Sequence, residues 1–536
     1  MVDLPNPLAN PQPARPVGTS RPLLLCGLLV CCLLPRALMA WKLGGLCPDG
    51  VAYIRVAQSF DRGGLAELLR HAPRDPLPVV LAVLHRSGLD WEVAGEAWGV
   101  LMASLVVLPL FGWLRRQFDQ RIALAGCLLY AVHSELIRWS PEVIRDPTFW
   151  FLATLSLYLS WRAVTEVRCG LFFAAGAETV MATSWRFEGL LLLLPLGLWS
   201  YWRWRALRQC RGRLLAGLCC CLGAAPALAL LLSVVWLRGH AVGDVFRLRP
   251  LVLAGGWLHT LPALLLGDAS VHSDVLPKTL GSISFARMLE IYLPTVFKGL
   301  TPLFVLLFGL GVVASWPTWK RRDNVPLLVA QVLLLLAIWV HLWSCHVSCK
   351  RYVFPLVLLS CGFAGMGLLR LSAVAARLAE HYLPALHGKR LFGAVPAIAA
   401  LALALLLAFS FDSNVRAEKA ALGRWIRDAG GPTPALFGPN GYTQVVNYYA
   451  QARCASFLVG AGDDVVLGVL RDYRPDLVVL PQDQADFRPE KPLLCRMEAA
   501  GFEPLDGGRV PRRCGRVLVL VRSQPAGRMP ETNNGL

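Results

Sequence analysis

One carboxylate stands directly after the first long apolar segment of the chain, in the run Pro48-Asp49-Gly50. An acid at the boundary between lipid and water can take a proton from a polar group that approaches from the water. The same three residues are also typical of a turn, because Asp and Gly favour turn conformations. Asp49 is therefore either a general base or a turn residue.

Other ionisable residues gather at the ends of apolar segments. They are Arg74, Asp75, Glu142, Arg145, Asp146, Arg186, Glu188, Lys350 and Arg351. Charges are costly within a bilayer and collect where they have a task. Carboxylates can accept a proton, and arginine or lysine can offset negative charge on a phosphate. The pattern therefore indicates a site that combines a base with anion-binding cations.

Membrane-spanning helices must position these residues, because the chain is more apolar than a soluble protein. Of its 536 residues, 55% are hydrophobic and 16% are charged, against about a quarter charged in soluble proteins. Eleven stretches approach the roughly 20 apolar residues that a spanning helix needs. They lie near 22–41, 92–114, 121–137, 147–165, 168–184, 187–204, 213–237, 291–316, 325–344, 352–371 and 391–411. We predict an all-α polytopic membrane protein.

Positive charge sets the predicted orientation. The net charge of +18 is concentrated in short loops that follow even-numbered spans, including those at Arg115, Arg162, Arg203, Lys320 and Arg377. Such loops stay in the cytoplasm, which puts the N-terminus inside and the C-terminus outside the cytoplasmic (inner) membrane. Arginines scattered over several loops form no continuous stripe for a phosphate backbone, so we expect no nucleic-acid partner.

Three parts of the chain are expected to differ in character. Residues 1–21 form a disordered cytoplasmic tail, 22–411 the transmembrane part with outer loops 42–91 and 238–290, and 412–536 an extracytoplasmic domain. The last part alternates apolar strands, such as 476–480 and 516–521, with helical patterns, which predicts a small α/β domain. It contains Cys454, Cys495 and Cys514, and an oxidising compartment would allow one disulfide with the pairing left open.

Two features have no assigned role. His341, Cys345, His346 and Cys349 are metal-ligand types, but the order Cys-His-x-x-Cys is neither a haem-attachment motif nor a usual zinc spacing. We therefore predict no metal site at these residues, and a requirement for a divalent metal is not readable from the sequence. Glu178 falls within a predicted span, where a carboxylate indicates function unless a shifted span brings it near water.

Several short motifs occur in a fixed order along the apolar part. The run Asp49, Tyr53, Ala57 has the spacing Asp-x-x-x-Tyr-x-x-x-Ala, and Ser140-Pro141-Glu142 through Asp146 precedes a long apolar span. Further along are Trp185-Arg186-Phe187-Glu188-Gly189-Leu190 and, before Pro355, Arg351-Tyr352. An earlier segment reads Arg74-Asp75-Pro76-Leu77-Pro78.

This order resembles the glycosyltransferase family 39 group over roughly 22–370. These are integral-membrane enzymes of the type C glycosyltransferase fold that include protein O-mannosyltransferases and lipid A aminoarabinose transferases. The segment 74–78 departs from the family's Pro-Pro-Leu-Tyr-Pro, because Asp75 replaces the first proline and the tyrosine is missing. The resemblance implies an inverting transfer of a sugar from a polyprenyl-phosphate carrier to an acceptor at the outer face.

The resemblance also implies roles for individual residues. Asp49 would be the catalytic base, and Asp146 would orient the acceptor or assist, unless it only caps the helix before Pro147. The donor phosphate would be bound by Lys350, Arg351, Tyr352, Arg186 and Arg74, and the cavity shaped by Glu188, Tyr53 and Glu142. Lys350 and Arg351 could instead be interfacial anchors. Arg186 and Glu188 could form an ion pair that shapes the cavity, or could simply end a short span.

Two other classes of function remain open. A transporter or lipid flippase would need broken helices at the midplane, internal repeats and a charged path, and the halves show no convincing repeat. A non-catalytic scaffold would leave the acids at the outer face without a task. The sugar, the carrier, the acceptor and the oligomeric state are not readable from the sequence.

Overall fold

The computed structural model describes residues 21–71, 75–206, 211–222, 285–315, 324–345, 349–382, 391–410, 414–429, 434–457, 463–481, 492–505, 510–514 and 517–522. The chain divides into two compact units. The membrane unit comprises Met1–Ala40 and Val56–Phe411, and the sheet unit comprises Trp41–Arg55 and Asp412–Leu536. Residues 1–20 of the predicted tail and 238–284 of the predicted outer loop lie outside the described residues.

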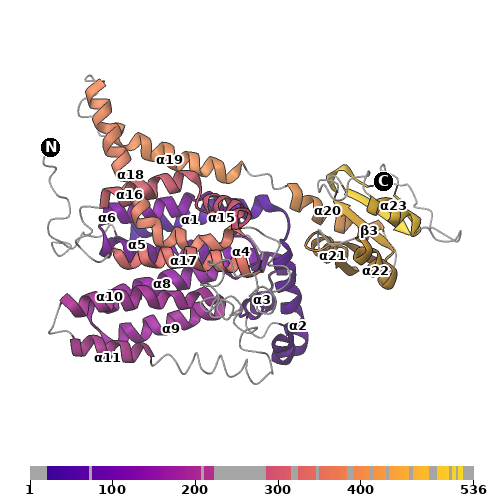
Figure 1. Ribbon diagram of the computed structural model, residues 1–536, viewed down its shortest axis with the longest axis horizontal. Coiled ribbons are helices and arrows are strands. Elements are labelled where there is room, and N and C mark those ends of the chain that lie inside the picture. The colour runs from indigo at the N-terminus through magenta and orange to yellow at the C-terminus, as the bar shows by residue number, and fades with distance from the viewer. Residues whose placement is uncertain are drawn as a thin grey trace, which may run out of the picture. The chain divides into compact units, whose positions relative to one another are not determined.

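Helices account for nearly all of the described part of the chain before residue 411 (Figure 1). They are α1 (Arg21–Leu43), α2 (Pro48–His71), α3 (Leu77–Arg86), α4 (Trp91–Leu105), α5 (Val107–Gln117), α6 (Gln120–Val132), α7 (Ser134–Trp139), α8 (Asp146–Glu166), α9 (Cys169–Trp185), η1 (Phe187–Leu192), α10 (Leu193–Ala206), α11 (Arg211–Leu222), α15 (Phe285–Leu300), α16 (Pro302–Ser315), α17 (Val325–Cys345), η6 (Lys350–Val353), α18 (Phe354–Tyr382) and α19 (Leu391–Phe409).

Three helical segments in the described ranges are long and apolar enough to cross a membrane: Pro22–Leu43, Trp91–Gln117 and Lys350–Leu378. A fourth candidate is the bent pair Leu289–Leu300 and Pro302–Ser315. Several shorter apolar helices accompany them, including Gln120–Val132. The protein is thus a multi-pass membrane protein, and the count of eleven spans stays a prediction.

The predicted span 291–316 is not one straight helix. α15 and α16 meet at 83°, and Thr301 between them has φ of +62°, in the left-handed region. Pro302 begins α16, where its missing N–H costs nothing because the first N–H groups of a helix have no partner within the helix. Hydropathy records the apolar run across both helices but is insensitive to a change in backbone direction.

Close helix contacts in the membrane unit depend on glycine. Gly311 of α16 faces the carbonyl of Phe363, and Gly367 of α18 faces the carbonyl of Leu307. A Cβ at either glycine would overlap the oxygen that it faces. Small residues allow helix backbones to approach closely in membranes, where van der Waals packing replaces the hydrophobic effect. α18 is thereby fixed against α16, and it also packs on α6.

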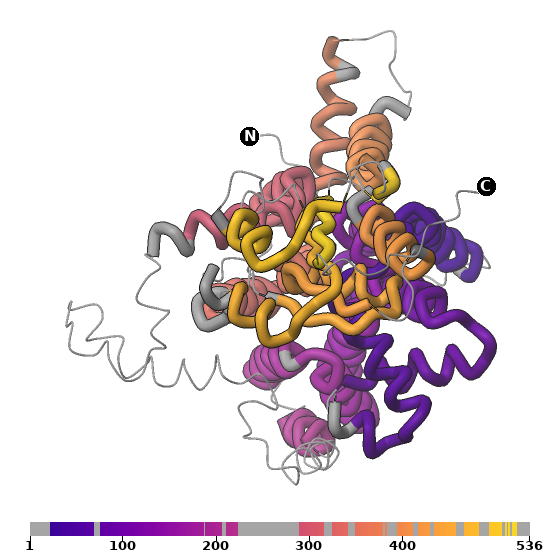
Figure 2. Tube along the Cα trace, turned by 90° about the vertical axis from the view of Figure 1, so that its right-hand side faces the viewer, coloured from indigo at the N-terminus to yellow at the C-terminus, as the bar shows by residue number. Residues whose placement is uncertain are grey.

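A second group of helices leads to the site. α9 packs against α8 and α11, and both views show the magenta segments α8 to α11 as neighbours (Figures 1 and 2). The hydroxyls of Ser156 in α8 and Thr179 in α9 lie 2.8 Å apart and are buried. Hydrogen bonds between such small polar side chains add to packing between membrane helices. This contact aligns the start of α8 with the end of α9.

The sheet unit contains a five-stranded mixed sheet of order β2-β1-β3-β5-β4. Its strands are β1 (Ala435–Pro439), β2 (Arg453–Phe457), β3 (Leu477–Pro481), β4 (Phe502–Pro504) and β5 (Val517–Arg522). β1 pairs in parallel with β2 and β3, whereas β5 is antiparallel to β3 and β4. Its helices are α20 (Asn414–Ala429), α21 (Tyr442–Ala450), α22 (Asp463–Tyr473) and α23 (Pro492–Ala499).

Both faces of this sheet are covered. Leu436 of β1 packs in a cluster with residues of α20 and α21, while the next residue, Phe437, packs with residues of α22 and α23. Side chains alternate between the faces of a strand, so a strand buried on both sides is apolar throughout. The segment Trp41–Arg55 joins this unit, where Leu46 N donates to the Tyr449 hydroxyl at 3.2 Å. The sequence-based division placed that segment in an outer loop of the transmembrane part.

The cysteines of this unit are thiols. Cys454, Cys495 and Cys514 are all unbridged, and the Asn447 amide donates to Cys454 Sγ at 2.9 Å.

Candidate active site

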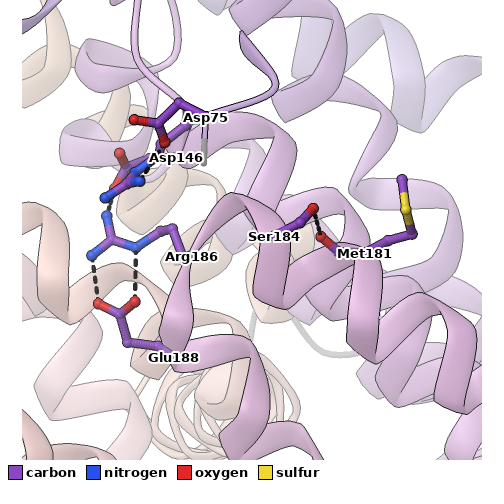
Figure 3. Close-up of polar contacts among 7 residues, drawn as sticks. Asp75, Asp146, Met181, Ser184, Arg186 and Glu188 are labelled. Atoms are coloured by element: carbon purple, nitrogen blue, oxygen red, sulfur yellow. Dashed lines mark hydrogen bonds and ion pairs between the residues drawn. The ribbon is translucent and has the colours of Figure 1, made fainter. Parts of the chain in front are cut away.

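Arg186 lies at the centre of a buried ionic cluster in the membrane unit. Its side chain is 5% exposed. Nη1 donates to Asp146 Oδ1, and Nη2 donates to Glu188 Oε1 at 2.6 Å. Figure 3 shows the guanidinium between the two carboxylates. The structure therefore adds Asp146 to the pair Arg186 and Glu188, and we call these three residues the Arg186 centre.

The local sequence explains how Arg186 and Glu188 come together. α9 ends at Trp185, Arg186 is extended with φ of −150° and ψ of 132°, and η1 follows at once. The chain then folds back so tightly that a Cβ at Gly189 would lie 2.6 Å from Thr183 N. Only glycine permits this approach. The spacing Arg-x-Glu-Gly therefore encodes both the ion pair and the turn that closes it.

Asp146 comes from the first turn of α8. Pro147 follows it, which suits a helix start, and a carboxylate is favourable near the positive end of the helix dipole. The side chain nevertheless points to Arg186 and is 2% exposed. Its buried charge is thus satisfied by a residue from another helix end, and the position does more than begin α8.

Two carboxylates share the single guanidinium of this centre. Burial alone would lower the pKa of Arg186, but Asp146 and Glu188 together raise it above its usual range, so the guanidinium stays charged. Glu188 is the more open partner, with a side chain 31% exposed. Two negative charges against one positive charge leave the centre with negative charge in excess. It is therefore better suited to orient a hydroxyl or amine than to bind a phosphate on its own.

A second ion pair borders the centre. Arg145 Nη1 donates to Asp75 Oδ1 at 2.5 Å, and both side chains are largely buried. Because Arg145 directly precedes Asp146, this pair ties the segment before α3 to the start of α8. Asp75 lies on the side of Asp146 away from Glu188 in Figure 3. Arg74, the neighbouring predicted phosphate ligand, lies outside the described residues.

The predicted phosphate-binding residues at 350–352 are only partly close to the Arg186 centre: Arg351 and Tyr352 lie beside it, and Lys350 does not. The Tyr352 ring lies 5.2 Å from the Arg186 guanidinium carbon and 5.6 Å from that of Arg351. Such cation–π contacts hold an arginine without neutralising it. Lys350 turns instead to Glu135, with Nζ 2.8 Å from Oε1. Of the two cations in this group, Arg351 is therefore the one beside the Arg186 centre.

Sequence reasoning missed Glu135 and Arg36. Glu135 lies near the end of the predicted span 121–137, where an acid among apolar residues was the available signal. Arg36 is fully buried and donates from Nε to Ser140 Oγ at 3.1 Å and from Nη1 to Ala131 O at 3.1 Å. An arginine inside the first predicted span was the available signal. It anchors the segment that carries the buried Glu142 towards Asp146.

Asp49 and Tyr53 belong to the sheet unit, which includes Trp41–Arg55. Asp49 is exposed in the first turn of α2, and Gly50 N donates to Cys47 Sγ at 3.3 Å behind it. Tyr53 is half-buried on the same helix. The helix start accounts for the turn-like sequence Pro-Asp-Gly, and the catalytic role of Asp49 stays a prediction. Of the residues considered for a metal, His346 lies outside the described ranges.

Comparison with known proteins agrees with this architecture. The family model of dolichyl-phosphate-mannose-protein mannosyltransferases matches residues 90–232. No curated protein sequence matches the chain. The matched region contains the whole Arg186 centre, including Asp146 and Glu188.

Solved structures resemble the chain over most of its length. The apo oligosaccharyltransferase of Archaeoglobus fulgidus has a TM-score of 0.55 at 14% identity, covering 86% of this chain and 70% of that one. Apo ArnT from Cupriavidus metallidurans has a TM-score of 0.55 at 15% identity, covering 93% and 97%. ArnT bound to undecaprenyl phosphate gives 0.54 at 15%, covering 95% and 99%. The chain accordingly has the type C fold of membrane glycosyltransferases.

Proposed function

We propose that the protein moves a sugar from a polyprenyl-phosphate carrier to an acceptor on the outer face of the cytoplasmic membrane, with inversion and with Asp49 as general base. The observation that carries the proposal is the Arg186 centre with Tyr352 and Arg351 beside it. It combines acids that can orient an acceptor with a cation that can meet a leaving phosphate. The ArnT structure with undecaprenyl phosphate supports a carrier of this class.

The charges suit a single displacement. As the acceptor oxygen attacks the sugar, a base removes its proton and the phosphate leaves with added negative charge. Arg186 is already matched by two carboxylates, so the phosphate needs a further cation, and Arg351 is the nearest candidate. Preorganised cations are worth more in a water-poor site than in bulk water. Binding of the phosphate would then complete the charge balance of the site.

The direct test uses membranes that contain the protein and a panel of radiolabelled polyprenyl-phosphate sugars. We expect label from one donor to enter a protein, lipid or polymer fraction only when active protein is present. Membranes with Asp49→Asn serve as the matched control. If no donor is consumed while ATP-independent movement of the labelled lipid between leaflets is accelerated, the protein is a flippase and the proposal is wrong.

Arg351 should matter for both donor affinity and turnover. A planar guanidinium can bind two phosphate oxygens, which lysine cannot reproduce, so Arg351→Ala should weaken both and Arg351→Lys should recover only part. Lys350→Ala should weaken donor binding less, because Lys350 is engaged by Glu135. Donor titration and single-turnover rates in nanodiscs would measure this, with exposed Arg370→Ala on α18 as control. Unchanged donor affinity in Arg351→Ala would place the phosphate elsewhere.

Orientation has its own test. Basic loops after the even-numbered predicted spans predict that the C-terminal part lies outside the membrane. A reporter that is active only after export should therefore be active when it is fused after Ser523. A cytoplasmic reporter at the same position should be silent. The opposite pattern would move the proposed face of reaction to the cytoplasm.

A further inference from the structure

A cavity of about 490 Å³ lies between α1, α5 and α8 in the membrane unit, away from the Arg186 centre. Tyr158 lines it, twelve residues along α8 from Asp146, which is about 18 Å at the helical rise of about 1.5 Å per residue. The volume falls in the range of roughly 300–1,000 Å³ typical of small-molecule sites. None of the residues that line this cavity is part of the Arg186 centre or of the ion pair Arg145–Asp75 beside it.

The lining of the cavity is amphipathic. Apolar side chains make most of it, including Leu24 of α1, Leu108 and Phe111 of α5, and Leu155 of α8. Polar groups come from Arg115, Arg116, Gln120 and Tyr158. A free anion would make no favourable contact with the apolar wall, and a hydrocarbon would make none with the arginines. The lining suits a molecule with an apolar chain and an anionic head.

The two arginines stand where a lipid headgroup would be. Both lie in the last turn of α5, at the end of the spanning segment Trp91–Gln117, and therefore at the membrane–water boundary. Arg116 Nη1 donates to the Tyr158 hydroxyl at 2.6 Å, and its guanidinium carbon is 5.2 Å from that ring. Both contacts are with a neutral group, so they orient the guanidinium without cancelling its charge.

The surrounding charges reinforce this end of the helices. Arg162 lies 5.7 Å from the Tyr158 ring and pairs with Glu166 at 2.7 Å, and Arg168 lies 3.7 Å from the same carboxylate. With Arg115 and Arg116, the arginines at this end of the helices outnumber the nearby acids Glu166 and Asp119. The excess positive charge favours an anionic headgroup, at about a few-fold in affinity for each basic residue near an anionic membrane surface.

We propose that this cavity binds an anionic phospholipid of the surrounding bilayer, with an acyl chain against Leu108, Phe111 and Leu155 and the headgroup phosphate at Arg115 and Arg116. Tyr158 positions Arg116 for this contact. The site is separate from the one proposed for the carrier phosphate at Arg351, and it stands whether or not that proposal holds.

Native mass spectrometry of the full-length protein in mild detergent tests the proposal, with phosphatidylglycerol, phosphatidylcholine and inorganic phosphate added in separate arms. We expect phosphatidylglycerol to be retained in preference to phosphatidylcholine, and inorganic phosphate not to compete. The variant Arg115→Gln/Arg116→Gln should lose roughly tenfold in phosphatidylglycerol affinity. Arg370→Gln/Arg377→Gln removes two exposed charges of α18 outside the cavity lining and should keep most of the phosphatidylglycerol affinity.

A second variant keeps the test decisive if the arginine pair is poorly expressed. Leu108→Trp fills the apolar wall without altering charge and should also lower phosphatidylglycerol retention. Equal retention of the two lipids, or equal losses in the cavity and control variants, would overturn the proposal. Competition by inorganic phosphate would show that the arginines hold a free anion and would overturn it as well.

Discussion

Arg186→Gln is expected to lower the free energy of unfolding by about 3–5 kcal/mol and to abolish sugar transfer, because it leaves the buried carboxylate of Asp146 without its counter-ion. Glu188, being partly exposed, can recover hydration, but Asp146 at 2% exposure cannot. Thermal and denaturant unfolding of the purified protein, alongside transfer assays, would measure the two effects separately.

Three companion variants separate charge from shape. Arg186→Lys keeps the charge but loses the fork that reaches both carboxylates, so it should recover part of the stability. The double variant Asp146→Asn/Arg186→Gln removes both buried charges and should be more stable than Arg186→Gln alone. Arg162→Gln breaks a more exposed helical pair with Glu166 and should cost about 1 kcal/mol or less. A double variant no more stable than the single one would show that the ion pair is not what Arg186 contributes.

Asp49→Asn should lower the transfer rate by roughly a hundred- to ten-thousand-fold, the usual contribution of a general base, with donor affinity nearly unchanged. Asparagine keeps the shape of the side chain and removes its ability to take a proton. The exposed position at the start of α2 predicts little loss of stability. Single-turnover transfer at saturating donor is the measurement.

Matched acids make this result specific. Asp61→Asn changes a carboxylate on the same helix that pairs with Arg86 on the surface, and it should transfer at close to the wild-type rate. Asp146→Asn should reduce transfer with a loss of stability that Asp49→Asn does not share. If Asp49→Asn is fully active and Asp146→Asn is not, the base belongs to the Arg186 centre.

The sequence alone determined the features that depend on neighbouring residues. Apolar runs located the helices, since hydropathy over about 20 residues reflects the membrane directly. The sequence offered an ion pair between Arg186 and Glu188 as one interpretation, and the structure contains it, because residues two apart meet when the chain folds back at a helix end. The order of such motifs was enough to predict the type C glycosyltransferase fold, which the comparisons confirm.

Only the tertiary structure decided which distant residues meet. Arg186 pairs with Asp146 across 40 positions, Lys350 with Glu135 across 215, and Arg36 with Ser140 across 104. None of these pairings has a sequence period, since each depends on how helices cross and on which ends align. Lys350 illustrates the limit: its charge predicted a phosphate ligand, but packing placed a carboxylate within 2.8 Å. Burial then makes Arg186 and Asp146 depend on each other, because a charge removed from water must find its counter-charge within the fold.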